Sequence, residues 1–531
     1  MSKLNDQQQS VVDSNADKIL VLAGAGAGKT HTMLERINRI INEGENPKHI
    51  LVLTFTNKAA FDMRDRYKRS HEGKIVPEFR TFHSFCYHLL VIDASIRTHL
   101  GYSQPPTVGD SGTIKKIEAE AKMQCNITLS DAKLHDITLC STLKEKQQHE
   151  LFTKNVKRLM KSKNIITFDI LAREVSELFT EDSQLVQLYK DRYRYIFVDE
   201  FQDTDPQQVK FISSFKSTKF CVIGDCLQNI YQFRGCTNDV IKALAKDDSW
   251  QHIRLFENYR STNQICNFAN KMSKYAEDAY RIEMRGQRDG DKVEVIPGAH
   301  ANWEAPVDSY HTKILLERLQ SRNEDKDVAV LCRTNKEVAY ICDKLKANGI
   351  LYSSGKRNED ALNILKSVND NDYMLDWLSS FLTAEKYAEY IRLASQVENP
   401  DIVWFASEYN QVPGIKERGK AIVDIRKVLR TKKAIISKVA DIFKILGIKS
   451  GEIKAIETDE DILPTIIDII ESQGDQDVYV GTIHSSKGLE YDTVYVMGVD
   501  DRSFQLGTEE MNNLYYVALT RAKNHLVVFT A

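Results

Sequence analysis

The residues best suited to chemistry lie near the start of the chain, in the segment AGAGAGKT between an apolar run and a helical pattern. Backbone N–H groups in such a loop point inward and bind phosphate oxygens, and the following helix adds positive potential. Lys29 would contact the β- and γ-phosphates, and the Thr30 hydroxyl would hold Mg²⁺. The sequence therefore predicts an ATP-binding P-loop made of Ala23, Gly24, Ala25, Gly26, Ala27, Gly28, Lys29 and Thr30.

This segment departs from the strict P-loop pattern at one position, because Ala23 stands where the pattern has glycine. A dinucleotide-binding loop is the first rival interpretation. It is disfavoured because G-x-G-x-x-G is absent and GKT is present. A purely structural glycine-rich turn is the second rival and stays open at this point.

A pair of acidic residues supplies the carboxylate that a P-loop needs to complete its metal site. Asp199 and Glu200 end the apolar run of YIFVDEFQDTD. Asp199 would coordinate Mg²⁺ directly or through water. Glu200 would orient and deprotonate the attacking water. The pair indicates phosphoryl transfer, either to a small molecule, as in a kinase, or to water, as in a motor.

These residues must be positioned by sheets. Short apolar runs typical of buried parallel strands occur at 18–24, 49–55, 193–200, 219–225, 327–334, 478–484, 492–499 and 524–530. Mainly helical patterns separate them in two places. The fold class predicted is α/β with two parallel-sheet domains, each carrying a helical insertion. The first domain comprises residues 1–95 and 185–275 around an insertion at 96–184; the second comprises 276–355 and 477–531 around a reduced insertion at 356–476.

Composition sets limits on the class of protein. The chain has 531 residues, 28% of them charged and 42% hydrophobic, as in ordinary globular proteins. No apolar run approaches the roughly 20 residues that span a bilayer, so we expect no membrane partner. The nine cysteines include no C-x-x-C pair, which disfavours a zinc ribbon. A net charge of −3 means that a nucleic acid would have to bind in a local basic groove.

Several further motifs follow one another in order along the chain. They are LNDQQQSVV at 4–12, LVLTFTNKAAFDMRDR at 51–66, RTFHSFCYHLL at 80–90, VDEFQDTDPQQ at 198–208, VIGDCLQNIYQFRGC at 222–236, LFENYRST at 255–262, GTIHSSKGLEYDTVYV at 481–496 and LYYVALTRAK at 514–523. Together with the P-loop, this series resembles the UvrD/Rep-like group of superfamily 1 DNA helicases. The resemblance spans residues 4 to 526 and implies two RecA-like domains with the nucleotide in the cleft between them.

The resemblance also implies roles for individual residues around ATP and Mg²⁺. Gln8 would read the base edge, Tyr259 would stack on adenine, and Glu490 would lie near the ribose beside Gly488. Gln228 would sense the γ-phosphate. Arg260 and Arg521 would reach that phosphate from the second domain as arginine fingers. The catalytic residues predicted are Lys29, Asp199, Glu200, Gln228, Arg260 and Arg521, with Thr30 and Asp199 holding the metal.

Single-stranded DNA would cross the top of both domains. Aromatic residues are candidate stacking platforms, although an aromatic residue beside a strand is more often part of the core. The DNA-binding residues that the resemblance implies are Thr54, Phe55, Thr56, Asn57, Lys58, Thr81, Phe82, His83, Tyr231, Phe233 and His484.

Several residues depart from the family's usual pattern, and His31 after GKT, where the family often has Arg, is one of them. The Asp after GD is Cys226 here, and the Ser beside the glutamine is Asn229. Near the last motif, Asn512 and Asn513 replace a common pair of arginines, so we expect that helix to contact its surroundings differently. The compact size is typical of a phage or mobile-element enzyme.

The function predicted is an ATP-dependent DNA helicase or translocase that moves 3′ to 5′ on single-stranded DNA and unwinds duplex DNA. Alternatives are a nucleotide-switched single-stranded DNA-binding regulator, and a translocase that displaces proteins without processive unwinding. A small-molecule kinase leaves the second α/β domain unexplained. We expect a monomer in the cytoplasm, associated with the nucleoid, or in the host cytoplasm if phage-encoded. Replication or repair proteins are possible partners.

Overall fold

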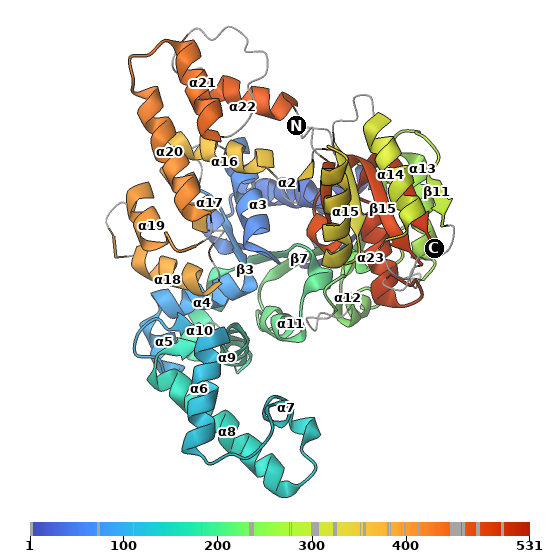
Figure 1. Cartoon of the computed structure of the whole chain (residues 1–531). Coiled ribbons are helices and arrows are strands. Elements are labelled where there is room, and N and C mark those ends of the chain that lie inside the picture. The colour runs from blue at the N-terminus through green and yellow to red at the C-terminus, as the bar shows by residue number, and fades with distance from the viewer. Residues whose placement is uncertain are drawn as a thin grey trace.

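The computed structural model describes residues 4–71, 75–109, 111–181, 183–232, 238–275, 277, 279–298, 307–321, 327–350, 352–353, 357–379, 382, 384–394, 396–397, 400–412, 414–446, 458, 462–473, 478–500 and 504–531. Figure 1 shows two neighbouring α/β bodies, with helical segments extending from the first body at the bottom and from the second at the top left.

The first body is built on a six-stranded sheet in the order β3-β2-β6-β7-β1-β8, in which every pair is parallel. Its strands are β1 (Lys18–Ala23), β2 (Ile50–Thr54), β3 (Glu78–Thr81), β6 (Tyr195–Val198), β7 (Lys219–Gly224) and β8 (Gln251–Leu255). Its helices are α1 (Asp6–Asp13), α2 (Lys29–Asn42), α3 (Asn57–Ser70), α4 (Phe82–Ile92), α11 (Pro206–Ser213) and α12 (Asp239–Leu244).

The second body repeats this plan with a parallel six-stranded sheet in the order β11-β16-β15-β12-β14-β13. Its strands are β11 (Glu294–Pro297), β12 (Val328–Cys332), β13 (Tyr352–Ser353), β14 (Val478–Thr482), β15 (Tyr491–Val499) and β16 (Ala522–Thr530). Its helices are α13 (Asn263–Ser273), α14 (Ser309–Ser321), α15 (Asn335–Ala347) and α23 (Glu509–Leu519). The predicted fold class of two parallel-sheet α/β domains is confirmed.

The interior strands of both sheets are apolar runs because helices cover both faces of a parallel sheet. Strand β1 is buried from Ile19 to Ala23, and β12 is buried over its whole length. The register places Leu20 between Val222 of β7 and His252 of β8. This packing makes each sheet a rigid support for the loops at its edge.

Helices emerge from each body between two strands. The first insertion contains α5 (Ala94–His99), α6 (Ser111–Gln124), α7 (Asp131–His135), α8 (Leu143–Ser162), α9 (Phe168–Thr180) and α10 (Gln184–Arg192), with the short parallel pair β4 (Thr107–Val108) and β5 (Ile165–Ile166). The second contains α16 (Arg357–Asn369), α17 (Asn371–Ser379), α18 (Ala384–Ala394), α19 (Ile402–Glu408), α20 (Ile415–Leu429), α21 (Ile435–Leu446) and α22 (Ile462–Gln473). Helix α18 contacts β4 and α4, so the second insertion rests against the first body (Figure 1).

Helix α13 packs on α23 and β16 of the second sheet, although the sequence-based division assigns residues 263–273 to the first domain. The chain passes between the bodies through β9 (Glu257–Asn258), which pairs with β10 (Arg285–Gly286). Within the part of the chain described above, no helix is both long enough and apolar enough to cross a membrane.

Candidate nucleotide and DNA site

The predicted site residues of the first body follow the carboxyl ends of its parallel strands. The P-loop follows β1, Thr54 ends β2, Asp199 follows β6, and Asp225 follows β7. In a parallel sheet these ends meet at one edge, where open α/β sheets bind their ligands. The topology alone therefore brings the glycine-rich loop and the acidic pair together.

The glycine-rich loop requires glycine at two positions. Gly26 and Gly28 have φ values of +67° and +74°, which side chains rarely adopt. A Cβ on Gly26 would lie 2.9 Å from Cβ of Arg260, and one on Gly28 would lie 2.8 Å from Nε2 of Gln8. Ala23, in contrast, is the last residue of β1, so the departure from the strict pattern falls where the backbone is a strand.

Lys29 begins α2 directly after this loop, and its Nζ lies 4.0 Å from Oε2 of Glu200. Glu200 has a left-handed backbone with φ of 50°, and its Oε2 accepts a hydrogen bond of 2.6 Å from Gln202. Burial alone would raise the pKa of Glu200, but the charges of Lys29 and Lys487 and the Gln202 hydrogen bond outweigh it and lower the pKa. Glu200 is therefore kept as a carboxylate, the form that a general base needs.

Asp199 lies beside this pair and is 6% exposed. Burial and the adjacent Glu200 charge raise the pKa of Asp199, and Lys29 opposes that shift. Oδ1 of Asp199 is buried without a hydrogen-bond partner. A hard cation such as Mg²⁺ takes oxygen ligands, so this carboxylate and the Thr30 hydroxyl at the start of α2 fit it.

The side of the site that is predicted to bind the base lies at the start of α1. Gln8 is 3% exposed, and both ends of its amide are engaged: Oε1 accepts from Asn5 N at 3.1 Å, and Nε2 donates to Ala27 O at 3.1 Å. Asn5 Nδ2 also donates to the hydroxyl of Tyr259 at 2.7 Å. Gln8 thus ties α1 to the P-loop, and Asn5 ties it to the ring predicted to stack on adenine. Base reading by Gln8 stays a prediction.

The segment between the bodies also contacts the P-loop. Tyr259 N donates to Gly26 O at 3.0 Å, and the fully buried Asn258 donates to Ala25 O at 2.7 Å. The Arg260 guanidinium donates from Nε to Glu490 at 2.6 Å and from Nη1 to Thr520 O at 3.1 Å. Residues 258–260 therefore contact both the P-loop and the second body.

Arg521 is placed beside the acidic pair but is only 1% exposed. Its guanidinium donates to Val517 O at 2.9 Å, Leu489 O at 3.1 Å and the Thr520 hydroxyl at 3.1 Å. Burial and the charge of Arg260 lower its pKa. These bonds hold Arg521 within its own domain, and its role as an arginine finger stays a prediction. Gly488 lies in the adjoining turn with φ of +85°.

A second set of contacts joins the two bodies behind Gln228. The Gln228 side chain donates to Asp225 at 2.7 Å, and the Tyr516 hydroxyl donates to the same carboxylate at 3.3 Å. Lys487 donates to Asp203 at 2.5 Å and to Gln228 O at 2.8 Å. Side chains of the second body therefore bind Asp225, Asp203 and the backbone of Gln228, the predicted phosphate sensor.

The expected DNA surface contains a stack of two rings. Phe55 and Tyr231 lie 4.9 Å apart at an interplanar angle of 21°, and Lys487 Nζ lies 4.9 Å from the centre of the Tyr231 ring. The ring centres of His484 and Tyr231 lie 6.3 Å apart, and burial lowers the pKa of His484. Thr56 is exposed and caps α3 by accepting from Ala59 N. These residues come from both bodies, as a strand crossing both would require.

Some predicted DNA-binding residues are not described or are not exposed. Phe233 lies outside the described residues, as do the side chains of Asn57 and Lys58. Phe82 is 4% exposed and packs against the ring of Phe211 at 5.1 Å, which places it in the core.

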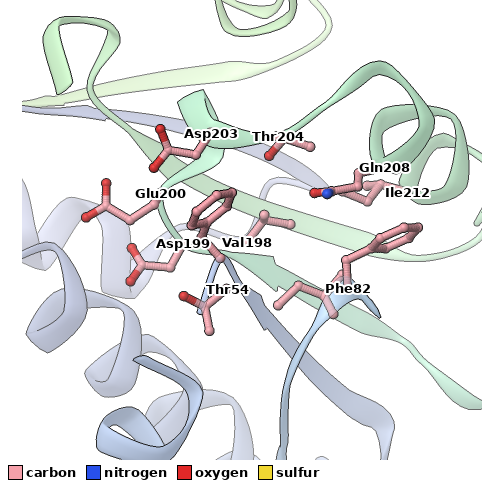
Figure 2. Close-up of a pocket in the computed structure, with 11 residues that line it drawn as sticks. Thr54, Phe82, Val198, Asp199, Glu200, Asp203, Thr204, Gln208 and Ile212 are labelled. Carbon is pink, nitrogen blue, oxygen red and sulfur yellow. The ribbon is translucent and has the colours of Figure 1, made fainter. Parts of the chain in front are cut away.

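Three more of these residues are wholly or partly buried. Thr54 is 6% exposed, and Thr81 is 8% exposed and caps α4. His83 is half-buried, with a pKa lowered by burial. Thr54 and Phe82 line a cavity beside the acidic pair in Figure 2, and their burial argues against direct contact with DNA.

Three of the family departures noted in the sequence meet at one place. Asn513 Nδ2 donates across the interface to Cys226 O at 3.2 Å and to Asn229 O at 3.0 Å. Asn512 instead accepts from Gly507 N within its own domain. Neither Asn513 nor Asn258 was predicted as a site residue, because each acts through a partner distant in the sequence.

Two family models match the chain in succession. The UvrD/REP helicase N-terminal domain matches residues 4–249, and the UvrD-like helicase C-terminal domain matches residues 253–359 and 366–531. YjcD of Bacillus subtilis (strain 168), a putative ATP-dependent DNA helicase, is 27% identical over 98% of this chain and 78% of its own length.

Two other relatives are similar over comparable lengths. The ATP-dependent DNA helicase PcrA of Staphylococcus epidermidis is 25% identical over 100% of this chain and 84% of its own length. A probable DNA helicase II homolog of Mycoplasma capricolum is 28% identical over 98% of this chain and 83% of its own length. The chain therefore belongs to the UvrD/Rep-like family of superfamily 1 ATP-dependent DNA helicases.

Proposed function

We propose that this helicase couples ATP hydrolysis to 3′-to-5′ movement along single-stranded DNA and unwinds the duplex that it meets. The proposal rests on the observation that both bodies contribute residues to the candidate nucleotide site. Lys29 and Glu200 come from the first body, whereas Glu490, which holds Arg260, comes from the second. A nucleotide that contacts both sides favours closure of the cleft, and its hydrolysis favours opening.

The first body holds the phosphates. Gly26, Gly28 and the start of α2 offer backbone N–H groups, and Lys29 supplies the fixed positive charge. Thr30 and Asp199 would hold Mg²⁺, which would supply charge neutralisation at the phosphate oxygens. Guanidinium groups reach the same cleft from Arg521 of the second body and from Arg260, which Glu490 of the second body holds.

Glu200 serves as the general base. Its carboxylate accepts from Gln202 and faces Lys29, so its orientation is fixed before ATP arrives. It would take a proton from the attacking water as the bond to the γ-phosphate breaks. Gln228, held by Asp225, would report the state of that phosphate to the segment that leads to Tyr231.

DNA binds where the stacked rings meet the second body. Phe55 and Tyr231 belong to the first body, and His484 and Lys487 to the second, so relative motion of the bodies changes the spacing of DNA contacts. Stacking accepts any base, which suits a motor that must pass every sequence. We further propose a monomer that acts on nucleoid DNA in the cytoplasm, with replication or repair proteins as partners.

The proposal is tested by measuring ATP hydrolysis with and without single-stranded DNA, followed by strand displacement. Strong stimulation of hydrolysis together with ATP-dependent unwinding is expected. Stimulated hydrolysis without unwinding indicates a translocase that displaces proteins. Nucleotide-dependent DNA binding without hydrolysis indicates a switched regulator and refutes the proposal.

A further inference from the structure

A small cavity lies between the acidic pair and the strand that leads to the DNA surface (Figure 2). Its volume is about 20 Å³, and much of its wall is apolar. The apolar lining comes from Leu53, Phe55, Phe82, Val198 and Ile212. A cavity of this size exceeds the roughly 10–15 Å³ that one water molecule needs.

Among the residues that line this cavity, Thr54 and Asp199 each carry a buried polar atom without a hydrogen-bond partner. These atoms are Oγ1 of Thr54 and Oδ1 of Asp199, and each residue is 6% exposed. In Figure 2, the Thr54 hydroxyl and the Asp199 carboxylate lie on the same side of the pocket. Buried polar groups in folded proteins nearly always have a partner, either protein or ordered water.

Other polar groups in the lining already form bonds. Oε2 of Glu200 accepts from Gln202, and Oδ2 of Asp203 accepts from Lys487. Gln208 donates to Asp205 at 2.8 Å. The Thr54 hydroxyl and Oδ1 of Asp199, in contrast, offer a donor and an acceptor that one water molecule can satisfy together.

We propose that the cavity holds one ordered water molecule, which accepts a hydrogen bond from the Thr54 hydroxyl and donates one to Oδ1 of Asp199. A carboxylate oxygen has two lone pairs, so Oδ1 can accept from this water and still face a metal ion. Thr54 is then a positioning residue for the carboxylate assigned to Mg²⁺. The assignment rests on the proposed nucleotide site.

This water connects the two functions of the first body. Thr54 is the last residue of β2, and the next residue, Phe55, stacks on Tyr231 at the expected DNA surface. A displacement of Phe55 by DNA reaches Thr54 through one peptide bond and reaches Asp199 through the water. Groups that hydrogen-bond to a metal ligand orient it, and their removal typically weakens metal affinity about 10- to 100-fold.

The test compares Thr54→Val, which removes the hydroxyl at nearly constant shape, with Thr54→Ser, which retains it. Thr218→Val is the matched control, because Thr218 is also 6% exposed but its hydroxyl donates to Tyr193 O at 2.7 Å, at the opposite end of the sheet. Crystal structures of each full-length variant show whether the water is present. A Mg²⁺ titration of fluorescent ATP-analogue binding gives the half-saturating Mg²⁺ concentration without depending on turnover.

We expect the water in wild type and in Thr54→Ser but not in Thr54→Val, with the half-saturating Mg²⁺ concentration raised about 10-fold in Thr54→Val alone. A dry cavity in wild type overturns the proposal, as does a Thr54→Val protein whose Mg²⁺ requirement stays within about twofold of wild type. An equal shift in Thr218→Val overturns it too. Absence of DNA-stimulated hydrolysis in wild type would instead refute the proposed function. The crystal structures would then still decide whether the cavity holds the water.

Discussion

Replacement of Asn513 by alanine should weaken the joint between the two bodies without disturbing the phosphate-binding loop. Asn513 lies in the first turns of α23, is 1% exposed, and donates to the carbonyls of Cys226 and Asn229 in the other body. A buried hydrogen bond contributes about 1 kcal/mol net, and an unpaired buried carbonyl costs about 1–3 kcal/mol. Loss of both bonds should therefore cost about 2–4 kcal/mol, or roughly 30- to 1,000-fold in the equilibrium between joined and separated bodies.

The consequence should appear in kcat for hydrolysis. The P-loop belongs to the first body, so ATP should still bind to Asn513→Ala, whereas groups from the second body should reach the phosphates less often. We expect DNA-stimulated kcat to fall at least about 10-fold, together with a longer mean distance between dyes placed on the two bodies.

Asn512→Ala provides the matched control. Asn512 is adjacent and 4% exposed, but its side chain accepts from Gly507 N within the second body. This variant loses a buried amide of the same size and should keep kcat near wild type. Equal losses of kcat in the two variants, or an unchanged kcat in Asn513→Ala, would refute the role of the asparagine joint.

The remaining predictions concern hydrolysis, coupling and acid stability. Lys29→Ala should lower DNA-stimulated hydrolysis at least about 10³-fold in a steady-state ATPase assay, because alanine removes the fixed charge at the phosphates; near-normal turnover would contradict the P-loop assignment. Glu200→Gln should bind ATP in a filter assay but lose turnover, since the amide keeps the shape and removes the base; loss of binding would make Glu200 structural. Tyr231→Ala should unwind poorly while keeping hydrolysis at saturating DNA and melting close to wild type, whereas a core aromatic would cost about 3–5 kcal/mol. Burial lowers the pKa of His88 from 6.5 to about 4. Below pH 6.5 the unfolded chain therefore binds a proton that the folded chain does not, and the free energy of unfolding measured by urea denaturation should fall from pH 6.5 towards pH 4. His88→Gln should make that fall smaller.

The interior of both sheets could be predicted from the sequence, whereas the edges could not. Every predicted strand, such as β1 or β15, lies inside a sheet, where burial on both faces requires a continuous apolar run. The edge strands β3, β8, β11 and β13 were not predicted. Strand β8 alternates exposed and buried residues, and β11 is largely exposed, so neither carries that signal.

The residues of the candidate site could likewise be predicted only in part. The P-loop and the acidic pair could be predicted because their chemistry depends on residues adjacent in the sequence. Thr54 and Phe82 could not be oriented, because a strand or helix buried on both faces gives no pattern that tells the DNA side from the core side. Asn513 stands out only as a departure from the family pattern, and its contacts could not be predicted because its partners Cys226 and Asn229 lie in the other body.

Strand displacement from tailed duplexes tests the central claim most directly. Two substrates with the same duplex and either a 3′ or a 5′ single-stranded tail are incubated with the full chain, ATP and Mg²⁺, and the displaced strand is followed over time. A motor that loads on single strand and moves 3′ to 5′ should unwind the substrate with the 3′ tail and leave the other largely intact. Equal or faster unwinding from the 5′ tail, or displacement that does not require ATP, would contradict the account.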